Sequence, residues 1–129
     1  KVPRTKVQKR IARSNRVSNK QVNRLARARA RLTNGKINER NAAISLLAEA
    51  KDRSSVPLLM RILENPREDY YLRAASARAL GRLGDTRAIS LLEKLGGMKQ
   101  AQERESGWEL RSACKFAIED IKLLKKSRK

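Results

Sequence analysis

Apolar residues recur at helical spacing in two adjoining segments near the centre of the chain. In residues 72–83 these positions are Ala75, Ala79, Leu80 and Leu83, and in residues 88–95 they are Ala88, Ile89, Leu92 and Leu95. Gly84 ends the first segment, because glycine reaches the left-handed conformation without a clash, and Asp85 or Thr86 caps the second. The pattern predicts two short helices that bury their apolar faces only when copies stack on either side.

The chain contains such copies. A shift of 33 residues superimposes Arg40 on Arg73, Leu47 on Leu80 and Asp52 on Asp85. A shift of 38 superimposes residues 110–121 on residues 72–83, with Arg111 on Arg73. Periods of this length are typical of solenoids built from paired helices.

The repeated segment LRAASARALGRLGDTRAISLLEKL resembles the short HEAT-like repeat, a variant also found in phycobilisome lyases. The resemblance covers residues 70–95, 38–63 and 107–124, and it rests on these positions: Arg73, Ala75, Ala79, Leu80, Gly81, Leu83, Gly84, Asp85, Ala88, Leu91 and Leu92. It implies an all-α fold, a short right-handed α-α superhelix of about two and a half repeats. It also implies a tendency to bind proteins or nucleic acids, but no particular reaction.

Charge divides the chain into unequal parts. The net charge is +19, and residues 1–36 hold thirteen Lys and Arg without one Asp or Glu. Residues 37–109 hold twelve bases and eleven acids, whereas residues 110–129 hold seven bases and two acids. A basic excess of this size favours a polyanionic partner, and nucleic acid is the usual one.

This division predicts three parts. Residues 1–17 form an extended basic arm, because they lack a sustained apolar face; a transit-peptide remnant is the alternative. Residues 18–36 form an Arg-rich helix that covers the first repeat, with Ser18 and Gln21 as its capping box. Residues 37–129 form the repeat body and end in a basic tail. The first residue is Lys1 and not Met, which indicates a processed or truncated chain.

The favoured function is a non-enzymatic nucleic-acid-binding adaptor, in which basic side chains grip phosphates and the repeats dock on protein or RNA. RNA is favoured over DNA, and the design is like that of proteins in a ribosome or another ribonucleoprotein, so protein subunits of a larger assembly are expected as further partners. The predicted nucleic-acid-binding residues are Arg4, Lys6, Lys9, Arg10, Arg13, Arg16, Lys20, Arg24, Arg27, Arg31, Lys125, Lys126 and Arg128.

Other functions stay open. A scaffold that binds an acidic protein without nucleic acid would use the repeat surface, and deletion of residues 1–36 separates the two ideas. A HEAT-like enzyme of the lyase or glycosylase type is less favoured, because the chain has no histidine and no grouped carboxylates. Binding to an anionic membrane surface is weaker still, since no bulky apolar face accompanies the basic stretch.

The composition predicts little further chemistry. No catalytic residue, metal site, cofactor, small-molecule substrate or membrane contact is predicted. The single cysteine, Cys114, copies the position of Ser76 and is predicted to be a packed helical residue rather than a reactive thiol. An intracellular location is expected, without a choice between cytoplasm and organelle.

Overall fold

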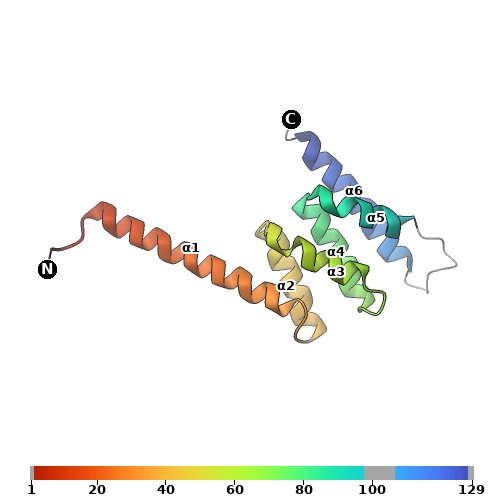
Figure 1. Cartoon of the computed structure of the whole chain (residues 1–129), viewed down its shortest axis with the longest axis horizontal. Helices are drawn as coiled ribbons and strands as arrows, with labels where there is room; N and C mark the ends of the chain where they lie inside the picture. Colours follow the sequence, from red (N-terminus) through yellow and green to blue (C-terminus); the bar gives the residue numbers. More distant parts are fainter. Residues whose placement is uncertain (1, 98–106, 128–129) are drawn as a thin grey trace.

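The computed structural model describes residues 2–97 and 107–127, and every regular element among them is helical. Three helices, α2 (Ile37–Glu49), α4 (Tyr70–Leu83) and α6 (Gly107–Ser127), lie side by side (Figure 1). The short helices α3 (Val56–Glu64) and α5 (Ile89–Gly96) form a second layer, in which α3 packs on α4 and α5 packs on α6. The prediction of an all-α fold of stacked helix pairs is confirmed.

The boundaries of the central repeat follow from local chemistry. Asp69 caps α4 by accepting a hydrogen bond from the backbone N–H of Leu72 at 3.1 Å. Gly84 ends α4 in the left-handed conformation, with φ +69°, as predicted. Asp85 then accepts from the N–H of Arg87 and begins a short 3₁₀ turn, η2 (Thr86–Ala88), that leads into α5.

Leucine, isoleucine and alanine fill the space between the two layers. Leu47, Leu59, Leu72, Leu80 and Ile121 are completely or almost completely buried. Small residues allow the closest approach, at Gly81, where an added Cβ would lie 2.7 Å from the Cα of Ala117. The small residues of α4 therefore admit α6 as a close neighbour.

The prediction of an extended arm over residues 1–17 is wrong from Lys6 onward. One continuous helix, α1 (Lys6–Arg31), crosses the boundary drawn at residue 17 and projects from the body (Figure 1). Its capping box consists of Thr5 and Gln8, and not of Ser18 and Gln21. The Thr5 Oγ1 accepts from the backbone N–H of Gln8 at 3.2 Å, and the Gln8 Oε1 accepts from the backbone N–H of Thr5 at 2.9 Å. The prediction of an extended arm rested on the lack of a sustained apolar face and missed this start signal.

The last turns of α1 connect the projecting helix to the repeats. Ala28 and Leu32 are buried against the body, and Leu25 is half-buried. Because α1 packs on α2 as α3 packs on α4, the end of α1 takes the place of a short second-layer helix. The predicted covering role of residues 18–36 therefore fits the part of α1 that follows Arg24.

Candidate binding surface on helix α1

Nine of the thirteen predicted binding residues lie on α1. Apart from the adjacent pair Lys9 and Arg10, they follow one another at intervals of three or four residues, which places them along one side of a helix with 3.6 residues per turn. We call these nine residues the basic seam: Lys6, Lys9, Arg10, Arg13, Arg16, Lys20, Arg24, Arg27 and Arg31. Those whose side chains are described are exposed, and the helix of 26 residues is roughly 39 Å long at 1.5 Å per residue.

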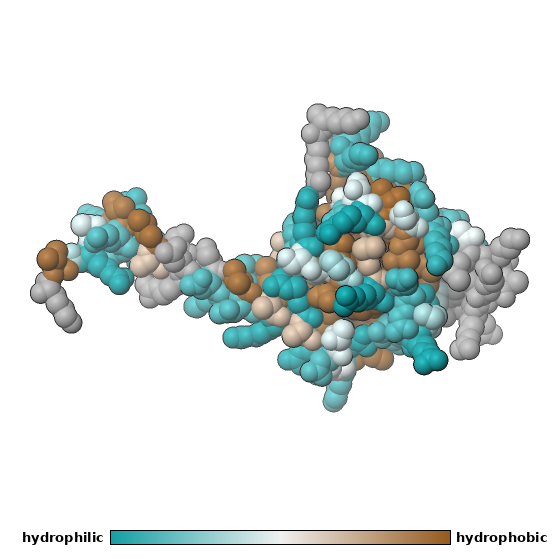
Figure 2. Space-filling model, viewed as in Figure 1, coloured by the Kyte–Doolittle hydropathy of each residue, from teal (hydrophilic) through white to brown (hydrophobic). Residues whose placement is uncertain are grey.

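The side of α1 opposite the basic seam carries exposed apolar residues. Val7, Ile11 and Val22 are each more than half exposed. Figure 2 shows brown apolar residues as well as teal polar residues on the surface of the projecting helix. α1 is therefore a basic amphipathic helix whose described interactions with the body are confined to its last turns.

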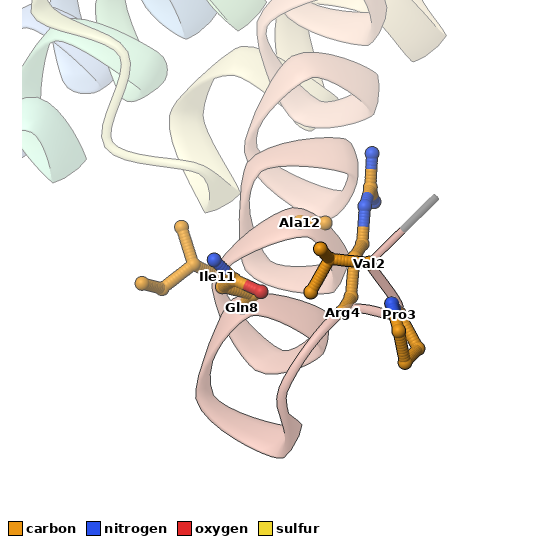
Figure 3. A pocket seen from close by; sticks show the side chains of 6 residues that line it. All are labelled: Val2, Pro3, Arg4, Gln8, Ile11 and Ala12. Atoms are coloured by element: carbon orange, nitrogen blue, oxygen red, sulfur yellow. The ribbon is translucent and has the colours of Figure 1, made fainter.

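The remaining predicted residues lie elsewhere. Arg4 precedes α1 and, with Val2 and Pro3, borders an open hollow of about 440 Å³ beside Gln8, Ile11 and Ala12 (Figure 3). Lys125 and Lys126 lie in the last turn of α6, away from α1 (Figure 1). Arg128 lies outside the described residues. The structure thus brings together the α1 residues but does not add the C-terminal ones to them.

Carboxylates of the body meet arginines in the last turns of α1. The Arg29 guanidinium donates to Asp52 at 2.6 Å, and that of Arg31 donates to Glu39 at 2.5 Å. Arg29 was not among the predicted binding residues, and its half-buried ion pair gives it a structural role. Arg31 was among them, and part of its charge is already matched by Glu39.

A groove of about 270 Å³ runs between α1 and α2 on the same side as the basic seam. Arginines of α1, one glutamate of α2 and several small or apolar side chains line it. We call it the α1–α2 groove, lined by Arg24, Arg27, Ala28, Arg31, Glu39, Ala42, Ala43 and Leu46. Sequence reasoning missed the apolar floor, although the pair Ala42–Ala43 on the neighbouring helix was a usable signal for a shallow site.

Two arginines that share one repeat position, Arg40 and Arg73, have structural roles. The Arg40 Nε–H donates to the carbonyl of Leu32 at 2.7 Å, and the Arg73 Nε–H donates to the carbonyl of Leu63 at 2.9 Å. Arg40 also makes a two-pronged pair with Glu68, at 2.9 and 2.6 Å. These hydrogen bonds from Arg40 hold the pKa of the Glu68 carboxyl below its ordinary value of 4.5, against the opposing effect of burial.

Candidate reactive groups are sparse among the described residues. Cys114 is fully buried, and burial raises the pKa of its thiol to about 12, so the reactive thiolate is suppressed near neutral pH. In the described part of the chain, no three His, Cys, Asp or Glu side chains form a group suited to a metal ion. None of the helices described combines the length and the apolar character required to cross a bilayer.

Two comparisons connect this geometry with known proteins. A sequence model for the family described as HEAT repeats matches residues 25–111. The deoxyhypusine hydroxylase of Candida albicans (strain SC5314) is 36% identical over 76 residues, which make up 59% of this chain. The matched segment spans only 22% of that relative, about a fifth of its length.

The comparison corrects the functional prediction. The favoured reading, a non-enzymatic nucleic-acid adaptor, is contradicted because the relative is an enzyme, and nothing in the comparisons supports RNA binding or a ribosome. The expectation that the chain has no enzymatic role is contradicted on the same finding. The argument against an enzyme relied on the absence of histidine. That absence carries little weight, because the chain matches only a small part of its relative.

Proposed function

Because the chain belongs to the HEAT-repeat family, we propose that it serves as a repeat segment of an enzyme of the deoxyhypusine hydroxylase type. The observation that carries this proposal is the 36% identity to that enzyme over 76 residues. The role assigned to the segment is to contribute the helical framework and a surface that helps hold the substrate or a partner subunit.

The structure supports a framework role through its most repeated contacts. The side chains of Arg40 and Arg73 fix the end of one helix to the next by equivalent hydrogen bonds. Gly81 and Ala117 set the spacing of α4 and α6. Such contacts determine how far apart and at what angle neighbouring repeats present their surfaces, which is what a substrate-binding solenoid requires.

The test uses the full chain under the reaction conditions that support the Candida albicans enzyme, which is the positive control. Mass spectrometry follows the gain of one oxygen atom by the deoxyhypusine-containing substrate, and calorimetry follows binding of the unmodified substrate. Turnover would show that this segment supplies reacting groups as well. Binding without turnover is the expected result for a framework segment. The absence of both turnover and binding would contradict the proposal.

A second experiment compares the unchanged chain with the variant Arg73→Ala. Removing this guanidinium breaks its hydrogen bond to Leu63 without touching any solvent-exposed surface of α1. If the repeat spacing positions the substrate, this variant should bind substrate more weakly while circular dichroism still reports a helical fold. Unchanged binding would separate the substrate surface from the repeat framework.

A further inference from the structure

We propose that the α1–α2 groove, together with the basic seam leading away from it, binds an acidic segment of another protein. The proposal concerns a binding surface and holds whether or not the chain takes part in hydroxylation. Three features of the described residues support it: unmatched charge, an existing pattern of arginine–carboxylate pairs, and an apolar floor.

The unmatched charge is the first feature. No acidic residue lies between Lys6 and Arg31, and like charges three or four residues apart repel one another along a helix. Arg24 and Arg27 form no ion pair among the interactions that the structure shows for its described residues, although both border the groove. An acidic segment placed along the seam would remove this repulsion.

The contacts that α1 already makes indicate what kind of anion suits it. Arg29 and Arg31, at the end of the same helix, are met by the carboxylates of Asp52 and Glu39. Glu39 lines the groove itself, so the groove already holds one arginine–carboxylate pair. Carboxylates from a partner would continue this arrangement toward Arg27 and Arg24.

The floor of the groove distinguishes a protein segment from a phosphate backbone. Ala28 and Ala43 are buried, and Leu46 is half-buried beside them. These side chains offer an apolar surface in the middle of a basic one, which suits a partner that alternates carboxylates with apolar side chains. Phosphates and sugars of a nucleic acid would gain nothing from this floor, and a lipid surface could not enter a groove between two helices.

The experiment measures binding of the full chain to a fluorescent synthetic peptide in which glutamates flank leucines at helical spacing. A peptide with serine in place of each leucine has the same charge and tests the floor. Anisotropy is recorded at about 0.15 M salt, where charges farther apart than about 8 Å are largely screened. We expect the leucine peptide to bind at least about tenfold more tightly than the serine peptide.

Two pairs of variants locate the site. The double variant Arg24→Gln, Arg27→Gln should weaken binding of the leucine peptide at least about tenfold, whereas Lys115→Gln, Lys122→Gln on exposed positions of α6 should change it less than about twofold. Ala42, which is exposed at the groove, provides the second pair: Ala42→Glu should weaken binding through repulsion, and Ala42→Gln should not.

Several results would overturn the proposal. Equal losses in the α1 and α6 double variants would mean that only net charge matters. Equal binding of the leucine and serine peptides would remove the floor from the site. Tighter binding of an RNA hairpin or of phosphatidylserine vesicles, with the same dependence on Arg24 and Arg27, would assign the surface to a different partner.

Discussion

The projecting part of α1 and the repeat body differ in how far their charges are balanced. Residues 37–109 hold twelve bases and eleven acids, and Arg40 of α2 forms an ion pair with Glu68 of the loop before α4. α1 has no acid of its own, and the exposed majority of its length makes no described ion pair with the body. The body therefore nearly balances its own charge, whereas the projecting part of α1 presents positive charge outward, which makes α1 the stronger candidate to meet an acidic partner.

The largest effect should come from the body's core. Leu80 is completely buried, so Leu80→Ala should lower the free energy of unfolding by about 2–5 kcal/mol through lost burial and a residual cavity. Val22→Ala on the exposed side of α1 should change it by less than about 0.5 kcal/mol. Urea denaturation followed by circular dichroism measures both, and similar losses in the two variants would contradict the contrast.

The next effect concerns the ion pair that binds two repeats. Glu68→Gln should lower the free energy of unfolding at pH 7 by about 1.5–3 kcal/mol, because Arg40 and Glu68 are each largely buried and share two charge-assisted hydrogen bonds.

This effect should depend on pH in a defined direction. The folded state holds the pKa of Glu68 below its ordinary value of 4.5, so the stabilisation is present above that value and is lost as the pH falls through the folded-state pKa. The difference between wild type and Glu68→Gln should therefore shrink in acid. A difference in unfolding free energy that stays constant from neutral to acidic pH would show that the substitution acts through packing instead.

A third effect tests how close the long helices of the body lie. Gly81→Ala places a Cβ 2.7 Å from the Cα of Ala117 and should cost about 1–3 kcal/mol, although alanine is the better helix former. The double variant Gly81→Ala, Ala117→Gly should show favourable coupling in a double-mutant cycle, because it restores space between α4 and α6. Purely additive losses would argue against direct contact.

The smallest effect belongs to α1. Each like-charge pair at helical spacing costs a helix about 0.2–0.5 kcal/mol, and salt reduces this repulsion. Raising the salt concentration from about 0.01 to 0.1 M should slow hydrogen exchange in residues 6–20 while leaving the amides of α4 unchanged. Equal responses in the two helices would mean that salt stabilises the whole chain and not the basic seam.

Local signals in the sequence were enough to predict most of the repeat body. The capping aspartate before η2, the left-handed glycine after α4 and the apolar spacing of residues 72–83 act within a few residues of one another, and each was confirmed. The repeat alignment also superimposed Arg40 on Arg73, and the two side chains make equivalent hydrogen bonds to the preceding helix end. The functional prediction was wrong because composition indicates the charge of a partner, but not which known proteins the chain is related to.

By itself, the sequence determined that the chain forms paired helices, where the central pair ends and that the N-terminal third is unmatched in charge, because these properties depend on neighbours along the chain. Only the tertiary structure decided that Asp52 and Glu39 reach the last arginines of α1, and that Ala42 and Leu46 line the same groove as Arg24. Those outcomes depend on which surfaces of α1 and α2 meet. The sequence could not predict them, because the spacing of charges along a chain does not give the distance between helices.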